Sequence, residues 1–206
     1  MTKFQVAYNK MWKWAVLAMF ATGLVAFVVS PALSAKGKRY ETIAASAMGT
    51  GTQVGQVVGV QMEIYQFSTP EDHQHLIEAF EKGQNQGLVN ALSRMKAVGR
   101  CAITGTLGYD VAFIRQTRTP TGRKILFVTN RRILFGEQFF NTRSKEYELT
   151  VGELDLNDTD KKKSTGVLYP AAQLAVDKDG QLKIKLIRNP WRLVGVLDWP
   201  GTPVVD

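Results

Sequence analysis

The chain has 206 residues, 26 of them basic and 18 acidic, so its formal net charge is +8. This length accommodates one domain together with a targeting segment. The single cysteine excludes an internal disulfide, and the basic balance favours anionic partners.

The first 35 residues are typical of a secretory signal peptide. Three lysines precede an apolar region without charge, and residues 30–35 then supply a proline break and small side chains for cleavage. The alternative is an uncleaved membrane anchor, because residues 14–35 make 22 consecutive uncharged positions, enough to cross about 30 Å of hydrocarbon. Because the lysines lie before the apolar region, the rest of the chain is exported in either case. We therefore expect an exported bacterial protein, periplasmic or extracellular, or anchored in the inner membrane.

Removal of residues 1–35 lowers the net charge to +5, because that segment carries three lysines and no acidic residue. Residues 36–53 are basic and then rich in alanine, serine, glycine and threonine, which predicts a flexible tether. We place a single domain at 54–198 and a C-terminal tail at 199–206, where two prolines end regular structure. Alternation within Val54–Phe67 predicts the first strand.

Two helices are expected after this strand. Thr69, Pro70 and Asp72 have the spacing of a capping box with proline in the first turn. The first helix ends at Lys82-Gly83, and a second, with apolar residues at helical spacing, ends at Gly99. The short connection predicts an αα-hairpin packed on one face of a sheet.

The centre of the predicted fold is a β-hairpin. Tyr109–Gln116 and Lys124–Thr129 are rich in β-branched and aromatic residues, and they flank a turn at Thr117–Arg123 that contains proline and glycine. Ile125–Val128 is apolar at every position, which is typical of a strand in the middle of a sheet that is covered on both sides.

Further strands follow. The first is predicted at Arg131–Gly136, and the polar stretch Gln138–Glu146 after it predicts a loop. Apolar residues occupy odd positions in 147–151 and even positions in 154–156, and this switch predicts a β-bulge at Gly152. Asp177–Gly180 predicts a hairpin turn, and Trp191–Leu197 predicts the last strand. We expect an α+β fold: a mainly antiparallel twisted sheet, as a sandwich or open barrel, with the αα-hairpin packed on one face.

No catalytic, metal or cofactor signature is present. The sequence contains no nucleophile elbow, phosphate-binding loop or dinucleotide fingerprint. His73 and His75 point in different directions on a helix and cannot chelate one metal as a pair. The acids of 155–160 lack the spacing of a calcium loop and are followed by three lysines, so we expect a solvated loop. Cys101 lies in a β-like run, where a buried and inert thiol is expected.

Paired carboxylates leave one catalytic alternative open. Glu153 and Asp155 fall on one face of a strand, where acid–base work is geometrically possible. Together with Glu137 they define the alternative of an unrecognised carboxylate-dependent hydrolase.

The most distinctive feature is a basic run interleaved with phenylalanine. Its charges could gather at one end of the sheet and hold phosphate or carboxylate groups, or they could only protect strand edges from aggregation. The predicted ligand-binding residues are Arg115, Arg118, Arg123, Lys124, Arg131, Arg132 and Arg143.

Export determines which partners this basic set could meet. The expected partners are an anionic envelope component, either a lipid head group or a glycan, or another protein. Nucleic acid is not expected outside the cytoplasm, and membrane contact is expected only through an uncleaved N-terminal segment.

Three stretches resemble a family of exported bacterial proteins without assigned function: Gly105–Asp110, Val128–Arg131 with Phe135–Glu137, and Leu168–Ala172. The resemblance covers about residues 55–197, implies export and a single domain, and carries over no site residue. We therefore expect a non-enzymatic cell-envelope protein that binds an anionic or amphipathic ligand or a protein partner. The alternatives are the hydrolase and a structural or assembly factor held at the membrane by residues 14–29.

Overall fold

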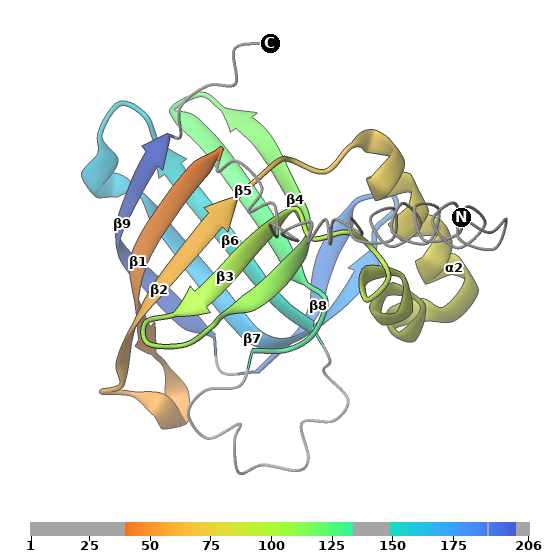
Figure 1. Cartoon of the computed structure of the whole chain (residues 1–206), viewed down its shortest axis with the longest axis horizontal. Coiled ribbons are helices and arrows are strands. Elements are labelled where there is room, and N and C mark those ends of the chain that lie inside the picture. Colours follow the sequence, from red (N-terminus) through yellow and green to blue (C-terminus); the bar gives the residue numbers. More distant parts are fainter. Residues whose placement is uncertain (1–39, 134–148, 189, 201–206) are drawn as a thin grey trace, which may run out of the picture. The chain divides into compact units, whose positions relative to one another are not determined.

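The computed structural model describes residues 40–133, 149–188 and 190–200, all within the compact unit Gly37–Asp206 (Figure 1). These residues form nine strands, one α-helix and two short 3-10 helices. In chain order they are β1 (Glu41–Gly49), η1 (Gly51–Gln53), β2 (Val57–Ile64), α2 (Pro70–Leu92), β3 (Gly99–Ile103), β4 (Tyr109–Thr119), β5 (Gly122–Thr129), β6 (Leu149–Asn157), η4 (Lys161–Lys163), β7 (Thr165–Val176), β8 (Leu182–Arg188) and β9 (Trp191–Pro200).

Eight of the strands close into a barrel. Each is antiparallel to its neighbours in the order β1-β2-β3-β4-β5-β6-β7-β9, and β9 pairs back onto β1. Because every barrel strand lies within residues 41–200 and has both neighbours there, the barrel closes without residues 1–39. The predicted antiparallel sheet is therefore confirmed, in the form of a closed barrel rather than a sandwich or an open one.

Strand β8 lies outside the closed barrel. The first half of β7 pairs with β9 through Gly166–Leu168, and its second half pairs with β8 through Ala171–Val176. The hairpin of β7 and β8 therefore extends beyond the barrel wall, next to α2 (Figure 1).

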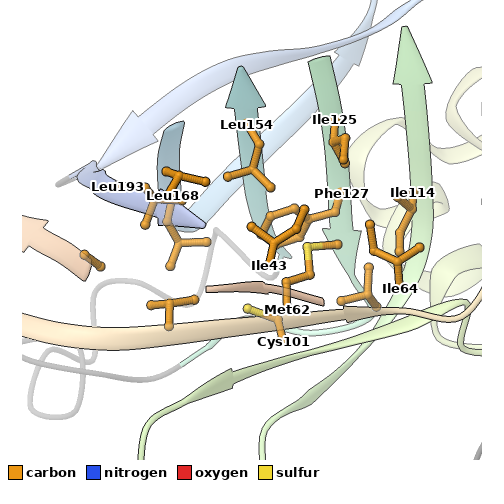
Figure 2. Close-up of a cluster of buried hydrophobic side chains, with 14 of the residues drawn as sticks. Ile43, Met62, Ile64, Cys101, Ile114, Ile125, Phe127, Leu154, Leu168 and Leu193 are labelled. Atoms are coloured by element: carbon orange, nitrogen blue, oxygen red, sulfur yellow. The ribbon is translucent and has the colours of Figure 1, made fainter. Parts of the chain in front are cut away.

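The barrel interior is one hydrophobic core. Side chains from opposite walls meet there, among them Ile43, Met62 and Phe127 (Figure 2). Phe127 occupies space that its cross-strand partner Gly152 leaves free, since a Cβ at Gly152 would lie 2.1 Å from the Phe127 ring. The interior is thus filled by interlocking side chains, as small closed barrels require.

A second core lies on the outer face of β4, β5 and β6. Leu76, Leu88 and Leu92 of α2 pack there against Phe113 and other outward-facing side chains. Strand β5 is consequently buried on both sides, with Ile125 and Phe127 in the barrel and Leu126 and Val128 outside it. This confirms the prediction from the unbroken apolar run.

The predicted bulge at Gly152 is wrong, because β6 has buried side chains on both of its faces. Leu149 and Val151 face the outer core, whereas Leu154 and Leu156 face the barrel interior. The pairing of β6 with β5 runs through Gly152 without a register shift. The pairing of β6 with β7 does shift register between Leu149 and Val151, and the additional residue belongs to β7. The change from odd to even positions therefore marks two buried faces of β6.

The predicted flexible tether at 36–53 is also wrong, because half of it is strand β1. Ile43 and Ala47 are buried in the barrel, and β1 pairs along its length with β2 and with β9. Small side chains suit a strand packed between two neighbours, although their composition resembles that of a linker. Strand β9 likewise runs to Pro200, past the predicted domain end at residue 198.

The helical region begins as predicted and then differs. Thr69 and Asp72 form the capping box, with N–O distances of 2.8 and 3.2 Å. The element α2 comprises two helical segments that meet at a kink at Gly83 and Gln84, where the backbone is not helical. The predicted end of the first helix at Lys82-Gly83 is therefore confirmed, but the structure gives a kinked helix in place of the predicted αα-hairpin. The helix ends at Leu92 and not at Gly99, because the chain there already enters β3.

Two further predictions concern loops and membrane spans. Residues 131–133 are not a strand, and the rest of the strand predicted at 131–136 lies outside the described residues, as does the loop at 138–146. Within the described ranges, no helix is long and apolar enough to cross a membrane.

Candidate functional site

A groove of about 550 Å³ lies on the outside of the barrel. Its floor is the outer face of β4, β5, β6 and β7, and the turn between β7 and β8 forms one wall. The groove adjoins the outer core, because Leu126, Val167 and Leu182 belong to both. These three side chains provide an apolar floor, where an apolar ligand group would be removed from water.

Arg115 differs from the other two cations that line this groove, Lys124 and Lys183. Its guanidinium donates to the side-chain oxygen of Gln181, while its Nε is buried and has no hydrogen-bond partner among the described residues. The other two cations of the lining are paired, Lys124 with Asp155 at 3.7 Å and Lys183 with Asp177 at 2.5 Å. No described carboxylate pairs with Arg115, so its charge is available to a ligand.

His73 does not compensate the charge of Arg115. Its ring stacks on Phe113 with centroids 6.1 Å apart, and its Nε2 is buried without a partner in the described part of the chain. Burial, and then the positive charge of Arg115, hold the pKa of His73 below its ordinary value. A neutral histidine therefore lies beside the arginine.

Carboxylates line the groove as well. Glu153 accepts a hydrogen bond from the Tyr169 hydroxyl at 3.4 Å, and burial followed by the Glu153 charge raises the pKa of Tyr169. A hydrogen bond from Lys183 lowers the pKa of Asp177. Asp155 and Asp179 complete the acidic lining. The site combines both signs of charge around an apolar floor and is not the uniformly basic patch that was expected.

The structure separates the seven predicted ligand-binding residues. Arg115 and Lys124 line the groove, and Arg118 lies exposed near the β4–β5 turn. Residues 131 and 132 follow the far end of β5, where Arg131 lies over the Tyr109 ring at 5.5 Å. Arg123 points into the barrel, and Arg143 lies outside the described residues. Ligand binding by this set stays a prediction, for which the groove unites two members.

Arg123 belongs to a buried ionic cluster at one end of the barrel. It contacts Glu41 across the interior, with NH1–Oε2 at 3.0 Å, and lies 3.3 Å from Asp198, which Lys161 also contacts at 2.8 Å. Burial raises the pKa of Glu41 against the opposing effect of Arg123. Burial also acts to raise the pKa of Asp198, but the hydrogen bond from Lys161 and nearby positive charges hold it below its ordinary value. This cluster ties β1, β5 and β9 together.

Two other candidates, Cys101 and the acidic loop at 155–160, agree with the predictions from the sequence. Cys101 is buried, which raises the pKa of its thiol to about 12. Across the described ranges, no three histidine, cysteine or acidic residues gather as a metal site. In the loop predicted to be solvated, the Asn157 side chain accepts hydrogen bonds from the backbone of Thr159 and Asp160, which satisfies the loop internally.

Sequence reasoning missed the wall of the groove. For Asp177 and Asp179 the sequence predicts only a hairpin turn, because nothing local indicates that this turn and the following Gln181 lie over β4. Comparison with protein-family models, curated proteins and solved structures finds no match for this chain. The functional interpretation therefore rests on the groove and on the ends of the barrel.

Proposed function

We propose that this is an exported, non-enzymatic cell-envelope protein that holds an amphipathic ligand with a small anionic head group in its groove. The observation that carries the proposal is Arg115, which is the only cation of the groove lining without a carboxylate partner among the described residues. An anionic ligand oxygen at its guanidinium would supply the missing opposite charge and so stabilise the complex.

The chemistry of the head group follows from the guanidinium. Arginine binds carboxylate and phosphate oxygens in a bidentate manner, and Lys124 lines the same groove. Glu153 and Asp177 lie in the same lining and repel additional negative charge. A head group with a single negative centre therefore fits better than a polyanion.

The apolar part of the ligand would lie on the floor. Leu126 and Val167 are half-buried there, and Leu182 connects them to the packed outer core. Apolar area removed from water contributes roughly 25 cal/mol per Å². An aliphatic chain along this floor would supply affinity, while Arg115 would set the orientation.

Matched single-chain amphiphiles test this function. Residues 36–206 are titrated calorimetrically with dodecanoate, dodecyl phosphate and dodecyltrimethylammonium, which share a tail and differ in head charge. We expect the two anions to bind and the cation to bind at least about tenfold more weakly. Arg115→Gln should lower affinity for the anions about tenfold, since hydrogen bonds to charged groups are worth about 1.5–3 kcal/mol.

Arg192→Gln is the matched control, because Arg192 is an exposed arginine of β9 that does not line the groove. An equal loss in both variants, or equal affinity for the cationic amphiphile, would contradict the proposal. Sequencing the N-terminus of the protein recovered from the cell envelope tests export and distinguishes cleavage after residue 34 or 35 from a retained anchor.

The hydrolase alternative retains one supporting observation. Glu153 and Asp155 both line the groove, on the same face of β6, whereas Glu137 lies outside the described residues. Under this alternative, the protein would hydrolyse an ester or a glycoside from a chromogenic panel, and Glu153→Gln would abolish the activity. Unchanged activity in Glu153→Gln would exclude that role.

A further inference from the structure

Three apolar side chains stand exposed at one end of the barrel. Tyr40, Leu197 and Trp199 are 49%, 53% and 51% exposed. In the register of β1 with β9, Trp199 lies opposite Thr42 and Leu197 opposite Ala44, next to the point where Tyr40 enters the barrel. Exposed aromatic side chains of this kind are favoured where an apolar medium meets water.

The same end of the barrel carries cations. The contacts of Asp198 with Arg123 and Lys161 place the β4–β5 turn and η4 beside the end of β9, an arrangement that Figure 1 shows. Lys162 and Lys163 of η4 and Arg118 near the turn are exposed. Asp160 pairs with Lys163 at 3.6 Å, and the Lys163 side chain remains 72% exposed. Aromatic and basic side chains thus share one surface.

The sequence immediately before Tyr40 is also basic, and an uncharged stretch precedes it. Lys36, Lys38 and Arg39 immediately precede Tyr40, and residues 14–35 before them are uncharged. We infer that this end of the barrel, defined by Tyr40, Leu197, Trp199 and the neighbouring cations, binds the surface of an anionic lipid bilayer. The surface lies on the barrel itself, so the binding does not require residues 1–35 to be retained.

The charges favour a bilayer over a second copy of this chain as the occupant. Two copies meeting through this end would bring Arg118, Lys162 and Lys163 toward cations of the same kind. An anionic bilayer offers opposite charge to the lysines and an interfacial layer to Trp199. Each basic residue near such a surface raises binding about fivefold, and salt weakens this contribution.

Tryptophan fluorescence reports on the contact directly. In residues 36–206 the only tryptophans are the buried Trp191 and the exposed Trp199. With phosphatidylcholine vesicles that contain phosphatidylglycerol, we expect a blue shift of the emission and quenching by brominated lipids. Vesicles of phosphatidylcholine alone should bind several-fold more weakly, and added salt should weaken binding to the anionic vesicles.

Substitutions locate the binding surface. Trp199→Ser should weaken co-sedimentation with anionic vesicles about tenfold, because interfacial binding scales with the buried apolar area. Leu107→Ser is the matched control: Leu107 is 87% exposed but lies in the loop after β3, at the opposite end of the barrel. Lys162→Gln combined with Lys163→Gln should remove most of the dependence on phosphatidylglycerol.

Three results would overturn the inference. They are an equal loss of binding in Leu107→Ser, a Trp199 emission that anionic vesicles leave unshifted, and a blue shift that appears without vesicles as the protein concentration rises. The last result would assign the surface to a second copy of the chain. The vesicle assays report on Trp199 and the amphiphile titrations on Arg115, so failure of the groove proposal and failure of this inference are distinguishable.

Discussion

The two faces of β5 are equally apolar, but they are buried in different ways. The inner face is enclosed by a ring of paired strands, and the Glu41–Arg123 contact spans one end of that ring. The outer face is covered only where α2 and the β7–β8 hairpin reach it. Beyond Leu126 and Leu182 this cover ends, and the groove begins. Hydrogen-bonded closure leaves no open border, whereas a partly covered sheet face provides a ligand surface with an apolar floor.

The largest loss of stability is expected when the Glu41–Arg123 contact at the end of the barrel is removed. Arg123→Leu would leave Glu41, which is 1% exposed, buried without its cation, and such a change costs about 3–5 kcal/mol. The free energy of unfolding, measured by urea denaturation at neutral pH, should fall by this amount.

The double variant Glu41→Gln with Arg123→Leu provides the control for that experiment. It removes both charges, so it should recover a large part of the lost stability. If the double variant is as unstable as Arg123→Leu alone, the loss comes from packing of the arginine stem and not from the unpaired carboxylate.

A cavity in the outer core should destabilise mainly the elements that surround it. Leu88→Ala deletes a fully buried side chain of α2, with an expected cost of about 2–5 kcal/mol. Hydrogen exchange should show lost protection in α2 and β8, while β1, β2 and β9 keep theirs. Val57→Ala, at an exposed position of β2, should change the free energy of unfolding little. A uniform loss of protection in Leu88→Ala would mean that the two cores unfold as one unit.

A smaller effect is expected from overfilling the inner core. A Cβ at Gly152 would collide with the Phe127 ring, so Gly152→Ala should destabilise the barrel by about 1–3 kcal/mol in thermal or urea unfolding. Phe127→Leu added to this variant should cost less than it does in the wild type, because the ring that obstructs the methyl group is gone. Gly83→Ala places its Cβ in open space and should be nearly neutral.

The smallest expected effect is a pH dependence of stability that comes from His73, which stacks on Phe113 of the outer core. The pKa of His73 is lowered by burial and by Arg115, so the folded state binds the proton less readily than the unfolded state. Stability should therefore fall as pH drops below about 6.5, toward the pKa of the folded state. In His73→Phe, which keeps the ring beside Phe113, urea unfolding between pH 7.5 and 5.5 should show a weaker decline. An identical decline would assign the pH dependence to other groups.

Several elements were predictable because their signals are local. The capping box of Thr69 and Asp72 lies within one turn of helix, and the turn at Asp177–Gly180 lies within four residues. Strand β5 could be recognised from Ile125–Val128, because an unbroken apolar run needs cover on both faces. The sequence could not predict which elements cover these two faces of β5. The inner face packs against the opposite barrel wall, and the outer face packs against α2.

Errors arose where the partner of a segment is distant in the chain. Residues 41–49 resemble a linker by composition, and they become a strand because β9, about 150 positions later in the sequence, pairs with them. Gly152 suggested a bulge because a single buried face was assumed. With two cores, regular alternation explains why Leu149 and Val151 face outward and Leu154 and Leu156 face inward. Gly152 leaves space for the Phe127 ring.

The amino-acid sequence by itself determined the antiparallel strands, the N-terminus of the helix and the burial of Cys101, because each depends on neighbours within a few positions or on hydrophobic pattern. Only the tertiary structure decided which cations can meet a ligand. Arg115 and Arg123 lie eight positions apart in the same basic run, yet one lines an open groove and the other meets Glu41, 82 positions away. The physical reason is the closure of the barrel: it sends alternate side chains of each strand to opposite sides of the wall, and the pairing of distant strands selects what each one contacts.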